Sequence, residues 1–118
     1  MQAIRERVAE TLGEMEREMR RIGHWTAEPP SAEALASTFP FCYDTLQFQE
    51  WLQWVFIPRL GAVLEGRHPL PEKSDMAPLA EVWFQEQGMA LEAARLLEII
   101  RELDRLLNAR RSAGVRGA

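Results

Sequence analysis

The stretch that decides the fold is DTLQFQEWLQWVFIPRLGAVLEG, residues 44–66. Asp44 is a suitable N-cap residue, and Gln47 stands three positions later, in the spacing of a capping box. At 100° per residue, the apolar side chains of residues 45–57 fall on nearly every side of the helix that they predict. A helix that is apolar all round is buried on all sides or covered by a partner. We therefore expect residues 45–57 to form the central helix.

Pro58 interrupts this segment. Proline has no backbone N–H, and its ring collides with the preceding helical turn. The sequence therefore predicts a kink or a restart near Ile57, after which the helix continues to about Gly66.

Apolar residues also recur at steps of three and four at both ends of the chain. The first such segment, residues 2–22, is followed by Gly23, which favours the left-handed conformation that ends a helix. The last segment carries the pattern of a helix-bundle seam, formed by Met89, Ala93, Leu96, Ile100, Leu103 and Leu107.

Two further elements complete the predicted fold. One is a helix with Pro78 in its first turn that stops at Gly88. The other is a short helix over residues 32–36, capped by Ser31, within a long prolyl connection. The fold class is therefore all-α, a compact bundle of four main helices plus one short helix. We assign residues 1–109 to a single bundle domain and residues 110–118 to a flexible basic tail.

The composition favours a cytoplasmic protein. The formal net charge is -4, which argues against a general polyanion binder. Cys42 is the chain's one cysteine, so no disulfide forms within the chain. The N-terminus lacks the apolar core of a signal peptide, and no apolar run is long enough to span a membrane. Direct nucleic-acid binding is not expected, because the arginines are few and mostly matched by glutamates.

Several short motifs carry a family resemblance. They are Ser31-Ala-Glu-Ala-Leu-Ala-Ser37, Pro40-Phe41, Asp44-Thr-Leu46, Trp51-Leu-Gln-Trp54, Ile57-Pro-Arg59, Pro69-Leu-Pro71 and Pro78-Leu-Ala-Glu81. From about residue 4 to residue 108 the chain resembles the YqcC-like family of short bacterial proteins. The resemblance implies an all-α bundle and no catalytic residue. Family members are often encoded beside a tRNA pseudouridine synthase, which suggests a role near RNA modification.

No catalytic, cofactor or metal site is predicted. His24, His68 and Cys42 are the chain's only histidine and cysteine residues, and they lack metal-site spacing. Cys42 would be a nucleophile if His24 lay beside it, but a lone cysteine between aromatic residues is more typical of a core. We interpret both histidines as ordinary polar residues at loop edges.

The leading functional hypothesis is a non-catalytic interaction module. Seven aromatic side chains lie within eighteen residues, at positions 39, 41, 43, 48, 51, 54 and 56. Aromatic residues are preferred interface anchors. We expect Trp25, Trp54 and Arg59 to be exposed. The candidate interaction surface comprises Trp25, Phe41, Tyr43, Gln47, Glu50, Trp51, Trp54 and Arg59. The partner would be another protein, such as the synthase, or a second copy of the chain.

The alternative is a small-molecule-binding protein or an unrecognised enzyme. Its polar pocket would lie beside the helix of residues 45–57, lined by Gln47, Gln49, Glu50, Gln53 and Arg59. The simpler explanation for Glu50 is a salt bridge to an arginine, for which Arg59 is a candidate, since a charge on an apolar helix usually persists only when paired.

Overall fold

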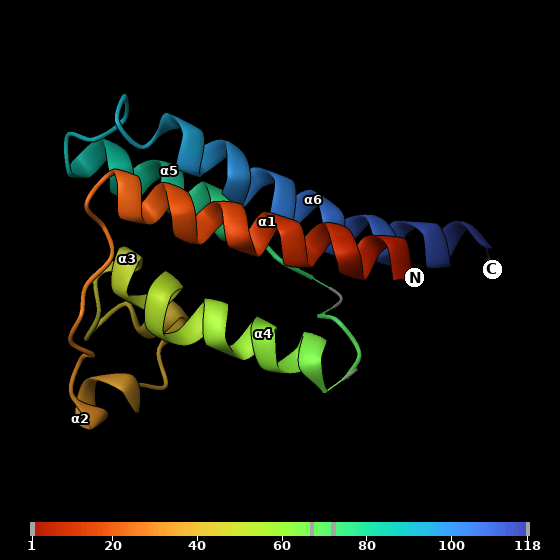
Figure 1. Cartoon of the computed structure of the whole chain (residues 1–118), viewed down its shortest axis with the longest axis horizontal. Helices are drawn as coiled ribbons and strands as arrows, with labels where there is room; N and C mark the ends of the chain where they lie inside the picture. The colour runs from red at the N-terminus through yellow and green to blue at the C-terminus, as the bar shows by residue number, and fades with distance from the viewer. Residues whose placement is uncertain (1, 67, 72, 118) are drawn as a thin grey trace.

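Two long antiparallel helices form the main framework of the fold. The structure, a computed structural model, describes the backbone of residues 2–66, 68–71 and 73–117, and side chains within 3–108 of those ranges. α1 (Gln2–Arg21) and α6 (Ala94–Gly117) lie side by side (Figure 1). α5 (Met76–Glu86) packs along α6, and α4 (Ile57–Glu65) crosses beneath α1.

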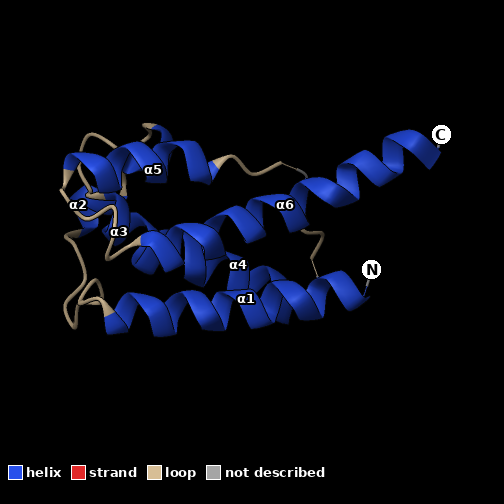
Figure 2. Cartoon of the chain, turned by 90° about the horizontal axis from the view of Figure 1, so that it is seen from above, coloured by secondary structure: helices blue, strands red, loops and turns tan. Residues whose placement is uncertain are grey.

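Every regular element in the described ranges is helical (Figure 2). The predicted all-α bundle is therefore confirmed. The segment from α3 (Phe48–Trp51) to α4 counts as one interrupted main helix, and α2 (Ala32–Leu35) is the short helix in the prolyl connection. Among the helices that the structure describes, none is long and apolar enough to cross a membrane.

The apolar stripe of α1 faces the core as predicted. Val8, Met15 and Met19 are completely buried. Gly23 ends the helix with a φ of +79°. The His24 amide donates back to the Met19 carbonyl at 2.8 Å, which satisfies an orphan group of the last turn.

A wide π-helical turn separates α3 from α4. This turn, η2 (Leu52–Phe56), ends where the Ile57 amide donates to the Leu52 carbonyl, five residues back. The wider turn accommodates Pro58, which cannot donate a backbone hydrogen bond and whose ring needs room. The predicted break near Ile57 is confirmed, and its form is a π turn.

The start of the central helix was predicted three residues too early. The helix begins at Phe48, with Gln47 as its N-cap. The Glu50 carboxylate accepts from the Gln47 amide at 2.8 Å, so the glutamate supplies the capping-box partner. Asp44 is not the N-cap, because its carboxylate instead accepts from the Ser37 hydroxyl at 2.5 Å.

α6 supplies the longest buried stripe. Leu96, Ile100 and Leu103 are fully buried, which confirms the predicted seam. The seam begins before the helix, since Met89 lies in the turn that precedes Ala94. The backbone of α6 stays helical to Gly117. Side chains of residues 109–117 and all of residue 118 lie outside the described part, so the predicted flexibility of residues 110–118 stays a prediction.

Asp104 of α6 fixes the start of α5. Its carboxylate accepts from the Ser74 hydroxyl at 2.6 Å, the Met76 amide at 3.1 Å and the Ala77 amide at 2.8 Å. A carboxylate at a helix N-terminus satisfies orphan amides and complements the helix dipole. The two helices are therefore joined by a polar contact as well as by apolar packing.

Arg5 of α1 caps the C-terminal end of α4. Its guanidinium donates to the carbonyls of Val63 and Leu64, each at 3.1 Å, and of His68 at 2.8 Å. Cations are favoured at helix C-termini, where carbonyls lack intrahelical partners. This contact ties α4 to α1.

Candidate interaction surface

A ladder of aromatic rings runs from the core to the surface. Phe84 is buried, and its ring centroid lies 6.3 Å from that of Phe48. The Phe48 ring stacks on Trp51 at 6.1 Å. Trp51 in turn contacts Phe41 at 4.8 Å and Phe56 at 5.4 Å. The last three rings are half-buried, so the ladder ends at the surface.

The turn that carries Phe41 has an unusual backbone. Phe41 and Cys42 have φ values of 59° and 50°, in the left-handed region. Each such non-glycine residue costs roughly 1–2 kcal/mol. The turn, η1 (Pro40–Cys42), is held by the packing of Phe41 on Trp51 and by the Cys42 amide, which donates to the Phe39 carbonyl at 2.9 Å.

Two aromatic side chains flank this turn and face solvent. Phe39 and Tyr43 are each 58% exposed. We call the set Phe39, Phe41, Tyr43, Trp51 and Phe56 the aromatic face. It contains three residues of the predicted surface, namely Phe41, Tyr43 and Trp51. The predicted surface does not include Phe39 and Phe56, although both belong to the aromatic run that suggested it.

The prediction that Trp25 and Trp54 are exposed is wrong, because both are half-buried. The Arg20 guanidinium lies 4.8 Å from the centre of the Trp25 ring, a cation–π contact. The Trp54 indole N–H donates to the Thr26 hydroxyl at 3.2 Å. These polar contacts attach both indoles to the chain itself. Arg59 is exposed, as predicted.

Gln53 is buried, and its side chain has a structural role that the sequence did not predict. Its side-chain oxygen accepts from the Thr26 amide at 2.9 Å, and its nitrogen donates to the Thr26 carbonyl at 2.7 Å. The side-chain amide thus pairs with both backbone groups of one residue in the long connection. Gln53 is 5% exposed, so leaving these groups unpaired would be costly.

The predicted Glu50–Arg59 salt bridge is wrong. Glu50 caps the Gln47 amide instead, because it lies in the first turn of α3, where unpaired amides need acceptors. Of the five residues named for a polar pocket, Glu50 and Gln53 therefore use their side chains in hydrogen bonds within the chain.

His24 is buried rather than an ordinary loop residue. It is 6% exposed, and its ring packs against Trp83 and Phe84 of α5. Its Nε2 atom lies 3.1 Å from the Met89 sulfur, while Nδ1 has no hydrogen-bond partner among the described residues. Burial lowers the pKa of the His24 imidazole. The interpretation as a loop-edge residue failed because the C-terminal turn of α1 directs the chain back onto α5.

Cys42 is buried as the simpler interpretation proposed. Its thiol lies 4.0 Å from the Ser37 carbonyl. No contact between Cys42 and His24 is found within the described side chains. In the same part of the chain, no three His, Cys, Asp or Glu residues are grouped as metal ligands.

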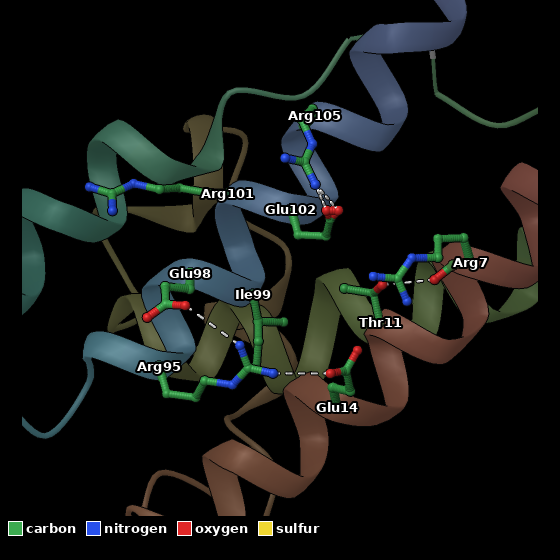
Figure 3. Close-up of a pocket in the computed structure, with 9 residues that line it drawn as sticks. All are labelled: Arg7, Thr11, Glu14, Arg95, Glu98, Ile99, Arg101, Glu102 and Arg105. Atoms are coloured by element: carbon green, nitrogen blue, oxygen red, sulfur yellow. Dashed lines mark hydrogen bonds and ion pairs between the residues drawn. The ribbon is translucent and has the colours of Figure 1, made fainter.

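A charged groove, which the sequence did not predict, lies between α1 and α6 (Figure 3). It has a volume of about 460 Å³. Arg95 bridges the two helices through a 3.2 Å ion pair with Glu14, and it also lies 3.6 Å from Glu98. The groove is lined by Arg7, Thr11, Glu14, Arg95, Glu98, Ile99, Arg101, Glu102 and Arg105. Opposite charges alternate along the groove, so it has no dominant sign.

These features define the class of protein. It is a small helical bundle whose described surface carries exposed aromatic side chains and a groove lined by charges of both signs. A family model described as DUF446, tRNA pseudouridine synthase C, matches residues 7–106. The chain belongs to this family, and the predicted YqcC-like resemblance is confirmed.

Full-length relatives extend along nearly the whole chain. An uncharacterised protein of Haemophilus influenzae is 37% identical over 105 residues, covering 89% of this chain and 96% of its own. The uncharacterised protein YqcC of Escherichia coli is 35% identical over 101 residues, covering 86% and 88%. The solution NMR structure of E. coli YqcC has a TM-score of 0.76 and 33% identity, covering 89% and 88% of the two chains.

One relative is a much longer protein. The Pectobacterium carotovorum protein named tRNA pseudouridine synthase C is 45% identical over 64 residues. The match covers 54% of this chain but only 17% of that protein. Most of the longer protein therefore has no counterpart here.

Proposed function

We propose that this chain is a non-catalytic accessory protein that docks onto a tRNA pseudouridine synthase through its aromatic face. The observation that carries the proposal is the exposure of Phe39 and Tyr43, 58% each, on either side of a turn whose Phe41 ring packs edge-on against Trp51. Neither side chain adds much to core burial. Aromatic side chains placed in this way are typical interface anchors.

The rigidity of the turn favours binding. Phe41 and Cys42 hold left-handed backbone conformations that together cost a few kcal/mol, roughly. The Phe41 ring is fixed on Trp51 at 4.8 Å, so the turn is ordered before any partner arrives. A preorganised anchor loses less conformational entropy on association and therefore supports higher affinity.

The relatives support a synthase as the partner. The family model carries the description tRNA pseudouridine synthase C. In Pectobacterium carotovorum a protein of that name includes a segment similar to this chain within a much longer polypeptide. A fusion of an accessory module to its enzyme would have this form. A cytoplasmic location goes with the proposal, since tRNA is modified there.

The test is binding of the purified chain to the pseudouridine synthase encoded in the same genome. Calorimetry compares the natural chain with the double variant Phe39→Ala and Tyr43→Ala. We expect the variant to lose about 2 kcal/mol or more of binding free energy, roughly 30-fold in Kd, as for interface hot spots.

The chain provides a matched control. Val82 and Leu91 are also exposed apolar residues, 50% and 91%, and lie outside the aromatic face. Changing both to Ala should leave binding unchanged. Equal effects of the two double variants, or no binding by the natural chain, would overturn the proposal.

A further inference from the structure

The segment that carries the aromatic face contains no basic side chain other than a histidine. Residues 22–58, which run from the end of α1 to the first turn of α4, include four acidic residues and neither lysine nor arginine. The rest of the chain holds all 14 basic side chains and the other 14 acidic ones, so its charges balance. The charge of this segment alone therefore equals the formal net charge of -4.

The acidic residues of this segment are not neutralised by bases. Elsewhere on the surface, carboxylates pair with arginines, as Glu16 does with Arg20 at 3.0 Å. Among the described side chains, no ion pair involves an acid of residues 22–58. Three of the four are exposed and the last is half-buried, in the order Glu28, Glu33, Asp44 and Glu50.

Two of these carboxylates lie next to residues of the aromatic face. Asp44 directly follows the exposed Tyr43, and its carboxylate accepts from the Ser37 hydroxyl at 2.5 Å. Glu50 directly precedes Trp51 in α3, and it accepts from the amide of its own N-cap residue at 2.8 Å. Both donors are neutral, so each carboxylate keeps its full negative charge beside the rings.

A third carboxylate is held beside the turn η1 by a contact of α2. Glu33 lies in α2, and the carbonyl of the next residue, Ala34, accepts from the Thr45 hydroxyl at 2.7 Å. This bond ties α2 to the end of the turn that presents Phe39 and Tyr43. Figure 1 shows α2 beyond α3, at the side of the molecule away from α6. The aromatic face therefore has an acidic rim, formed by Glu33, Asp44 and Glu50.

We infer that the synthase surface that receives the aromatic face is an apolar groove rimmed by arginine and lysine side chains. The synthase as occupant rests on the proposed function, and the basic rim rests on charge complementarity. Carboxylates bind guanidinium groups in a bidentate manner, and exposed rings attract the same cations through their faces. Tyr43 and Asp44, which are neighbours in sequence and both exposed, provide one group of each kind.

The test is the rate of association of the purified chain with the synthase, measured by stopped flow. Raising the salt from about 0.05 M to about 0.5 M shortens the screening length about threefold. Complementary rim charges act mainly on the encounter of two proteins. The association rate should therefore fall roughly 10-fold or more, while the dissociation rate changes little.

The triple variant Glu33→Gln, Asp44→Asn and Glu50→Gln removes the charges of the rim and keeps its hydrogen bonds. Asparagine retains an oxygen for the Ser37 hydroxyl, and glutamine is a regular capping-box residue. At the lower salt this variant should associate roughly 10-fold more slowly than the natural chain. It should also lose most of the salt dependence.

A second triple variant, Glu86→Gln, Glu92→Gln and Glu98→Gln, is the matched control. These acids are exposed and lie outside residues 22–58, and the change in net charge is the same. The control should associate as the natural chain does. Arg59→Gln tests the sign of the effect, because Arg59 is the first basic residue after the segment and is exposed. Its loss should not slow association.

Three results would overturn the inference: equal slowing in the two triple variants, slower association of Arg59→Gln than of the rim variant, or an association rate that does not respond to salt. Binding that requires Phe39 and Tyr43 but ignores salt would refute this inference alone. Absence of binding at either salt would refute it together with the proposed function.

Discussion

His24 is a polar residue in an apolar environment, and it should make folding sensitive to pH. Its pKa is lowered by burial, so the unfolded chain takes up a proton before the folded one. The folded state is therefore fully stable above the ordinary histidine pKa of about 6.5 and loses stability as the pH falls through it. The loss is at most about 1.4 kcal/mol per pH unit.

Urea unfolding at about pH 7.5 and about pH 5.5 checks this prediction. We expect the midpoint of the natural chain to fall, and that of His24→Phe to change much less, because phenylalanine does not titrate. His68→Gln is the control, since His68 is exposed and its loss should leave the pH dependence in place. A pH dependence that survives in His24→Phe would contradict the account.

The partners of buried polar side chains were the feature least predictable from the sequence. Gln53 stood among aromatic residues and was assigned to a pocket, whereas its side chain pairs with the backbone of Thr26. The two residues are far apart in sequence, and a side-chain amide bonds any backbone that tertiary folding brings to it. The periodicity of a sequence shows which face of a helix is apolar. It does not show which distant segment packs against a polar residue of that helix.

At the scale of elements, α5 depends on a cap supplied from another helix. Asp104→Ala would leave the Ser74 hydroxyl and the amides of Met76 and Ala77 without this acceptor. We expect a loss of about 2 kcal/mol in the free energy of unfolding. Glu98→Ala is the matched change, an exposed acid on the same helix, and it should cost less than about 0.5 kcal/mol. Equal losses would show that the cap contributes little.

The helices were predictable and their ends were less so. The stripes of α1 and α6 depend on local spacing, which a sequence states directly. The start of α3 depended on a choice between Asp44 and Gln47 as the N-cap, and both have suitable chemistry. A contact outside the helix decided it, since Ser37 binds the Asp44 carboxylate. The Pro58 break was predictable from proline geometry, but proline allows a kink, a restart or a wider turn, and the sequence does not distinguish the π turn from the other two.

At the scale of the whole molecule, the aromatic segment proved to be both core and surface. The rings of Phe84 and Phe48 are buried, and the series of ring contacts continues outward to Phe41. The sequence predicted that some aromatic residues of the segment are exposed. It did not predict which, because the exposure of Phe39 and Tyr43 follows from the left-handed turn between them.

Amide hydrogen exchange of the chain, with and without the synthase, tests the central claim most directly. If the aromatic face is the docking surface, added synthase should slow exchange at residues 39–43 and 51–56. The groove between α1 and α6 should be unchanged. Protection centred on that groove, or no protection at residues 39–43 in a complex that demonstrably forms, would contradict the account.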